Sequence, residues 1–139
     1  MVATACAGLF AGAAIYINLV EHPGRLSCGI DLAIREFGPS YHRATIMQAS
    51  LAIVGCGAGL VAAWQRGAVE LGIAALLLGS VVPFTLLVIL PTNKRLLDPA
   101  LGRNSAEAAQ LLKRWGWLHS VRSVASTLAF VLLIASVAK

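Results

Sequence analysis

The chain has 139 residues, of which 58% are hydrophobic and 12% charged, and its net charge is +5. A soluble domain carries about 25% charged residues to cover its surface, so this composition excludes a soluble enzyme, a disordered protein and a second folded domain. The basic excess does not indicate nucleic-acid binding, because its distribution along the chain follows a membrane topology.

Charge-free runs predict four transmembrane helices in a single all-α domain, residues 1–139. Three runs, 1–20, 46–63 and 71–90, are each about long enough to cross the ~30 Å hydrocarbon core. A fourth run, 124–138, reaches spanning length only when it is extended back past His119 and Arg122. The predicted helices lie at about 1–21, 42–64, 69–91 and 105–138, with a short interfacial helix at about 29–37.

Prolines and caps set the predicted helix ends. Pro23 biases His22 away from helical geometry, and Gly38-Pro39 stops the interfacial helix. Pro91 and Pro99 break the second long connection. The last helix is expected to begin at Asn104 or Ser105, with Glu107 as the capping-box partner of Asn104.

Small residues at helical spacing favour close packing of these helices. Gly8 with Gly12, and Gly55 with Gly59, lie four residues apart, which lets helix backbones approach closely in lipid. The predicted architecture is an antiparallel four-helix bundle, and the same small-residue faces would allow a homo-oligomer.

The basic residues predict the orientation of the bundle. Nine fall in or beside the two longer connections, and two fall on the other side. By the positive-inside rule both termini are non-cytoplasmic, and the protein is a multi-pass protein of the plasma (inner) membrane by default. The nine are Arg25, Arg35, Arg43, Lys94, Arg95, Arg103, Lys113, Arg114 and Arg122, and the two are Arg66 and Lys139.

Each predicted helix also carries polar residues at its cytoplasmic end. Taken singly, these have ordinary explanations: an aromatic belt, snorkelling side chains, or an ion pair between Glu21 and Lys94 or Arg95. Three of them, however, reach the apolar depth, where polar groups usually face the bundle interior. The set therefore predicts a polar pocket open to the cytoplasm. The three are Gln48, His119 and Arg122, and the rest of the set includes Asn18, Glu21, His22, Tyr41, Thr45, Thr92, Asn93, Lys94, Arg95 and Trp115.

No metal or disulfide framework is predicted. The three cysteines form no close pair, and the histidines show no HxxxH or Glu-x-x-His spacing. A haem or metal held by His22 and His119 stays open as an alternative, although the nearby cations oppose it.

Four motifs resemble the anthrone-oxygenase-like family of small integral membrane proteins, much of which is catalogued only as a domain of unknown function. They are Asn18 with Glu21-His22-Pro23, Tyr41 with Arg43 and Gln48, Pro91-Thr92-Asn93-Lys94-Arg95-Leu96, and Arg114-Trp115 with His119 and Arg122. The resemblance implies a four-helix membrane bundle. It also implies oxidation of a polyketide anthrone to the anthraquinone by molecular oxygen, without flavin or metal.

Under that resemblance the site residues take roles. His119 is the expected base, with His22 as the alternative, and Arg122, Lys94 and Arg95 stabilise the oxyanion and the peroxide. Asn93, Gln48 and Tyr41 orient oxygen atoms, Trp115 stacks on the substrate, and Glu21 holds His22 or a cation. Asn18, Arg43 and Thr92 complete the expected substrate-binding set.

Two other functions remain open. A carrier would hold a small amphipathic anion at the cytoplasmic leaflet with the same cations and would release it chemically unchanged. A structural subunit would use the polar end to dock a partner, so that changes at Gln48 or Arg122 would disturb assembly.

Overall fold

The computed structural model describes residues 1–137, and these residues form helices and short connections without a strand. Four stretches are long and apolar enough to cross a membrane: Val2–Ser27, Ile30–Arg66, Val69–Leu96 and Ala106–Ser136. The protein is therefore all-helical with four membrane-spanning-capable helices, as the charge-free runs predict. The last residue of the predicted fourth helix, Ala138, and the basic residue Lys139 lie outside the described residues.

The four stretches are built from shorter elements. The first contains α1 (Val2–Tyr16), the π-helix η1 (Ile17–Glu21) and α2 (His22–Ser27), and the second is α3 (Ile30–Arg66). The third contains α4 (Val69–Gly79), α5 (Val81–Phe84), the π-helix η2 (Thr85–Ile89) and α6 (Leu90–Leu96), and the fourth is α7 (Ala106–Val137).

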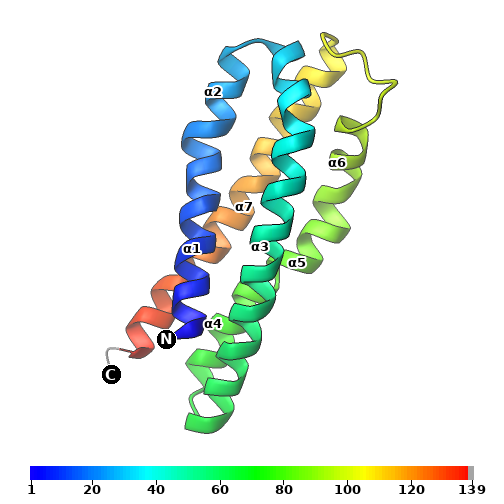
Figure 1. Ribbon diagram of the computed structural model, residues 1–139. Helices are drawn as coiled ribbons and strands as arrows, with labels where there is room; N and C mark the ends of the chain where they lie inside the picture. Colours follow the sequence, from blue (N-terminus) through cyan, green and yellow to red (C-terminus); the bar gives the residue numbers. More distant parts are fainter. Residues whose placement is uncertain (138–139) are drawn as a thin grey trace.

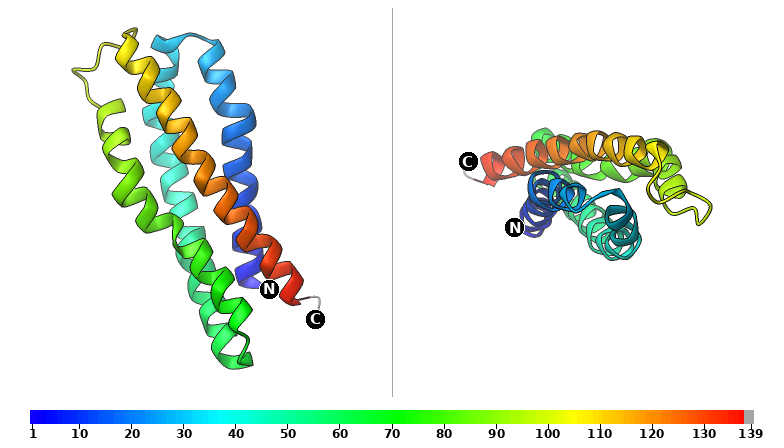
Figure 2. Two further views of the ribbon diagram at one scale, coloured as in Figure 1. Left: turned by 180° about the vertical axis from the view of Figure 1, so that it is seen from behind. Right: turned by 90° about the horizontal axis from the view of Figure 1, so that it is seen from above.

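The start of α1 and the end of α7 lie toward one end of the molecule, opposite the α2–α3 and α6–α7 connections (Figure 1). The helix α1 packs against α3 and α7, and α4 packs against the same two helices. Seen from behind, α7 crosses the other helices obliquely (Figure 2).

Two hydrophobic clusters stabilise the bundle, one toward each end. One is centred on Phe10, Leu78 and Leu133, and the other on Phe37 and Trp115. Along α7, three buried polar residues lie between these clusters: His119, Ser123 and Ser126. The apolar packing thus encloses a polar layer near the middle of the helices.

Glycines on α3 let the neighbouring helices approach closely. A Cβ at Gly55 would lie 2.7 Å from Leu78 Cδ2, and one at Gly59 would lie 2.6 Å from Ala75 Cβ. The close approach predicted for this glycine pair is confirmed. In the first helix only Gly8 is crowded, by the Phe130 ring, since a Cβ at Gly12 would meet no atom within 4 Å.

Pro23 and Pro91 do not end their helices, contrary to the sequence prediction. His22 has helical φ and ψ of −66° and −46°, and the chain stays helical through Ser27 and, in the third stretch, through Leu96. A π-helix ends two residues before each proline. The wider π-turn accommodates the proline ring and the missing N–H, so the helix continues.

The predicted interfacial helix is also not separate. Residues 30–66 form one helix, with Pro39 inside it. Pro39 removes one backbone donor, but Ala33 and Phe37 are fully buried against the second cluster. This packing keeps the first turns of α3 helical. The last helix starts after Ser105, one of the two predicted residues, and the Ala108 N–H donates to Ser105 Oγ at 3.0 Å. The cap is therefore Ser105 rather than the predicted Asn104.

Candidate functional site

A small cavity, here called the His119 cavity, lies between α3, α7 and the η1–α2 segment. Its polar lining comes from residues far apart in the sequence, and its volume is about 20 Å³. That is room for about one water molecule. The structure thus brings together seven residues of the predicted polar set: Glu21, Tyr41, Thr45, Gln48, Trp115, His119 and Arg122.

A hydrogen-bond network orients the His119 ring. The Asn18 amide donates from Nδ2 to the Gly116 carbonyl at 3.1 Å and to Ser120 Oγ at 3.0 Å. A backbone carbonyl only accepts, so this contact fixes the amide orientation and leaves Oδ1 facing His119 Nδ1, at 2.7 Å. Because Oδ1 also only accepts, Nδ1 carries the proton and Nε2 keeps its lone pair.

The elements position this network by their helical repeat. Gly116, Ser120 and Ser123 follow one another along a single face of α7, next to η1. Ser123 Oγ donates a second hydrogen bond to Asn18 Oδ1, at 2.5 Å. His119 is fully buried, and its Nε2 has no hydrogen-bond partner in the part of the chain that the structure describes. The unpaired nitrogen is therefore available to a bound molecule.

Arg122 supplies a cation that no carboxylate within residues 1–137 neutralises. Its Nη2 donates to Gln48 Oε1 at 2.6 Å, and its Cζ lies 5.4 Å from the centre of the Phe10 ring. Two N–H donors, Arg122 Nε and Gln48 Nε2, are buried without partners among the described residues. Since a desolvated charge is costly without a counter-ion, this arrangement favours an anionic ligand.

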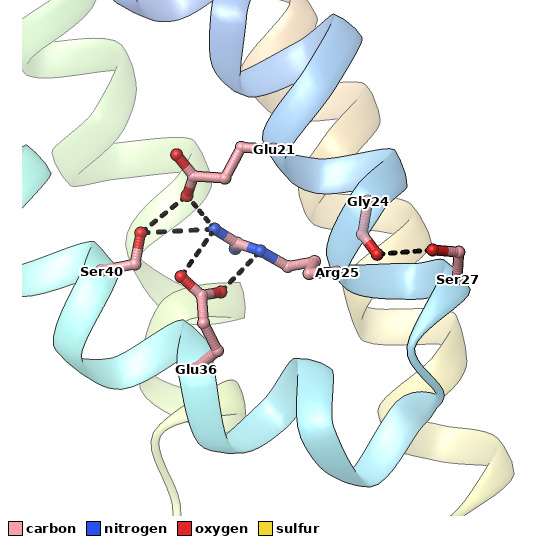
Figure 3. Close-up of polar contacts among 6 residues, drawn as sticks. All are labelled: Glu21, Gly24, Arg25, Ser27, Glu36 and Ser40. Carbon is pink, nitrogen blue, oxygen red and sulfur yellow. Dashed lines mark hydrogen bonds and ion pairs between the residues drawn. The ribbon is translucent and has the colours of Figure 1, made fainter.

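Arg25 is a second buried cation, and unlike Arg122 it lies beside two carboxylates (Figure 3). It forms ion pairs with Glu21 and, at 2.7 Å, with Glu36 Oε2. Ser40 Oγ completes the cluster by donating to Glu21 Oε1 at 2.7 Å. We call Glu21, Arg25, Glu36 and Ser40 the Arg25 cluster.

From the sequence, Arg25 is predicted only as a topological residue, and this role is not apparent. The one signal available was the spacing of Glu21 and Arg25, four residues apart in a helix. The carboxylate of Glu21 thus binds a cation, as expected, but that cation is Arg25 rather than Lys94 or Arg95.

Trp115 joins the aromatic groups of the site. Its ring centre lies 5.1 Å from that of His22, 4.8 Å from that of His119 and 5.3 Å from that of Phe37. His22 also packs on the backbone of α7, where a Cβ at Gly116 would lie 2.6 Å from His22 Nε2. Glycine at 116 is therefore what lets His22 approach.

Several predicted site residues lie elsewhere. Thr92 and Asn93 are buried but do not line the His119 cavity, and Lys94 is exposed. Arg95 is exposed and pairs with Asp98 at 2.6 Å and Glu107 at 2.8 Å. The Ala100 N–H and the Arg95 guanidinium hold the pKa of Asp98 below its usual range. The expected participation of these residues in the site stays a prediction.

A wider groove, the outer groove, lies on the other side of Glu21 and Ser40. It runs between α1–η1 and α3, has a volume of about 690 Å³ and is lined by Tyr16, Met47 and the predicted site residue Arg43. Glu21 and Ser40 line both spaces. The Arg25 cluster therefore forms part of the wall between the groove and the His119 cavity.

The chain is similar to a known protein family and to named members of it. The profile of the family described as anthrone oxygenase matches residues 37–132. Anthrone oxygenase nsrD of Aspergillus novofumigatus is 33% identical over 100 residues, which cover 66% of this chain and 62% of that protein. Anthrone oxygenase tpcL of Aspergillus fumigatus is 45% identical over 64 residues, 43% of this chain and 39% of that protein.

A third relative, anthrone oxygenase dmxR16 of Cryptosporiopsis sp., is 29% identical over 125 residues, which cover 82% of this chain and 71% of that protein. The matches to the first two relatives span less than two thirds of their length. No solved structure matches the chain. The matched range, residues 37–132, spans Gln48, His119 and Arg122 and begins after Asn18 and Arg25.

Proposed function

Because the chain belongs to the anthrone oxygenase family, we propose that it oxidises an anthrone-like aromatic carbonyl compound to the quinone with molecular oxygen. One observation carries the proposal. A histidine with a free Nε2 lone pair and an arginine without a carboxylate partner within residues 1–137 line the same buried cavity. A base and a cation are what an ionising carbon acid needs.

The proposed reaction begins with proton transfer. An anthrone carries a CH₂ group between two aromatic rings, opposite a carbonyl. His119 Nε2 accepts a proton from this carbon, and the negative charge spreads to the carbonyl oxygen. The positive charge of Arg122, which no carboxylate within residues 1–137 neutralises, stabilises that oxyanion.

The anion then reduces molecular oxygen, and a C–O bond forms at the deprotonated carbon to give a peroxide. The His119 imidazolium returns its proton to the peroxide. Loss of the remaining proton from that carbon and cleavage of the O–O bond leave the new carbonyl and water. One oxygen atom enters the quinone and the other enters water, so the substrate supplies all the electrons, and the proposed reaction uses neither flavin nor metal.

The substrate is proposed to enter from the outer groove. The His119 cavity, at about 20 Å³, is too small for three fused rings, whereas the groove holds about 690 Å³. The hydrogen bond from Ser40 to Glu21 lies in the wall between them. Separation of η1 from α3 at this contact would join the two spaces.

In the proposed orientation the helices form an antiparallel bundle, with non-cytoplasmic termini and the Arg25 cluster toward the cytoplasm. The position of the start of α1 and the end of α7, opposite the two basic connections, supports it (Figure 1). Cys28, which is free and exposed in the α2–α3 connection, provides the test. A membrane-impermeant maleimide should label it only from the cytoplasmic side, and labelling from the other side would reverse the orientation.

The decisive experiment is oxygen-dependent turnover of an anthrone by the purified protein in nanodiscs. His119→Ala should lower kcat about 10²–10⁴-fold, the usual contribution of a general base. His42→Ala is the matched control, because His42 is exposed and should keep wild-type kcat. Unchanged turnover in both His119→Ala and His22→Ala would reject a histidine base.

The carrier and the structural subunit are the alternatives to this enzyme. A carrier would bind the same anion beside Arg122 but would consume no oxygen, so oxygen uptake with bound anthrone separates it from the enzyme. A structural subunit would lose assembly rather than ligand affinity in Arg122→Gln, which size-exclusion chromatography would detect.

A further inference from the structure

A second cavity, here called the apolar cavity, lies between α1, α3 and the α5–η2 segment. Its volume is about 80 Å³. The Thr85 hydroxyl, one of its few polar groups, is occupied by the Val81 carbonyl at 2.7 Å. A cavity whose lining is mostly apolar takes up small apolar molecules. The apolar lining residues are Phe10, Ala49, Ala52, Val81, Val82 and Leu86.

The two cavities share one wall. Thr45, Gln48 and Arg122 line both of them. Gln48 is 1% exposed, and its Nε2, like Arg122 Nε, has no hydrogen-bond partner among residues 1–137. An apolar space therefore adjoins buried N–H donors, and these donors adjoin the His119 cavity.

We propose that the apolar cavity binds molecular oxygen and holds it beside Arg122 for reaction with the substrate anion. This inference rests on the proposed function. Molecular oxygen is small and apolar, so it dissolves better in hydrocarbon than in water. Leu86 is 57% exposed on the side of the bundle, so the cavity opens toward the lipid, where oxygen is concentrated.

The unpaired donors explain why oxygen would react at this place. Neutral oxygen accepts hydrogen bonds poorly, so Gln48 Nε2 and Arg122 Nε gain little when it binds. One electron from the substrate anion converts it to superoxide and leaves a substrate radical. The new negative charge then satisfies both donors, which stabilises the product of electron transfer more than the reactants. Combination of superoxide with the radical forms the C–O bond of the peroxide.

Binding of oxygen can be tested without turnover, because oxygen is paramagnetic. We would measure the relaxation of labelled methyl groups in nanodiscs under oxygen and under argon. Val82 and Leu86 should relax faster under oxygen than Leu128, a lipid-facing control that is 52% exposed. Ala49→Leu, which fills the apolar cavity, should remove the difference. Equal relaxation of the methyl groups of all three residues, or a difference that survives Ala49→Leu, would overturn the proposal.

Kinetics give the second test. Ala49→Leu and Val82→Phe fill the cavity from opposite walls and should raise the KM for oxygen about fivefold or more while leaving the KM for the anthrone unchanged. Ala5→Leu, at an exposed position of α1, is the control and should change neither. An equal rise in both KM values would overturn the proposal, because the cavity would then belong to the substrate pocket. If the wild type oxidises no anthrone, the proposed function fails, whereas the relaxation experiment still decides whether oxygen binds here.

Discussion

Asn18 Oδ1 accepts hydrogen bonds from both His119 Nδ1, at 2.7 Å, and Ser123 Oγ, at 2.5 Å. A residue of η1 thereby sets the tautomer of a histidine 101 positions away in the chain. The orientation of Asn18 is itself fixed by the Gly116 carbonyl. The availability of the His119 Nε2 lone pair therefore depends on contacts between the first and the last membrane-spanning stretches.

Asn18→Leu should lower kcat roughly 10–100-fold, in line with the loss of other orienting partners of histidine. The substitution keeps the volume but removes the acceptor that fixes Nδ1–H. The measurement is steady-state turnover, with ¹⁵N NMR of His119 to follow the tautomer. Ser120→Ala is the control: it removes one acceptor of the Asn18 amide and leaves the His119 contact in place. A fixed Nδ1–H tautomer in Asn18→Leu would contradict the prediction.

Arg122→Gln should lower kcat about 10²–10³-fold, because it removes a cation beside the developing oxyanion. The free energy of unfolding should stay the same or rise, since a buried charge without a counter-ion is costly to the fold. Turnover and denaturant titration in detergent measure the two effects separately. A clear loss of stability would show that Arg122 serves the fold instead.

Arg25→Gln should destabilise the protein, because it leaves the carboxylates of Glu21 and Glu36 without their cation. We expect a loss of about 2 kcal/mol, below the ~3–5 kcal/mol of a fully buried pair, since Glu36 is 43% exposed. Arg35→Gln is the matched control: its partner Asp31 is 45% exposed, so the loss should stay below about 0.5 kcal/mol. Thermal unfolding of both variants checks the difference, and equal losses would contradict it.

Gly116→Ala should destabilise the protein by about 1–3 kcal/mol, as overpacking does, because the new Cβ would lie 2.6 Å from His22 Nε2. Gly57→Ala, where a Cβ meets no atom within 4 Å, should instead stabilise α3 by up to about 1 kcal/mol. The two unfolding midpoints should therefore move in opposite directions. A common direction would mean that His22 does not depend on Gly116 for its position.

The four spans could be predicted because a run without charge reports directly on burial in lipid. The π-helices and the path of the chain at the prolines within these spans could not be predicted, because the sequence rules for helix ends describe an isolated α-helix. Pro23 and Pro91 follow π-helices, which no residue type predicts. Pro39 stays helical because Phe37 is buried against another helix.

The grouping of Gln48, His119 and Arg122 followed from one physical rule, that polar side chains at apolar depth face inward. The same rule could not tell a paired cation from an unpaired one. Arg25 sits beside two carboxylates and Arg122 beside none within residues 1–137. Spacing indicates only the pairing of Arg25 with Glu21, because the approach of Glu36 depends on how the helices pack.

The length of α3 has a consequence for kinetics. Its 37 residues extend about 55 Å, far more than the ~30 Å of hydrocarbon. The charge-free part begins at Ala44, so we expect Gln48 to lie just inside the lipid tails and Glu36, about 18 Å farther along the helix, to lie among the headgroups. Under the proposed function, a site at this depth would draw amphipathic substrate from a two-dimensional pool. Its rate should follow the substrate-to-lipid ratio, and adding empty vesicles at constant bulk substrate should slow it by surface dilution.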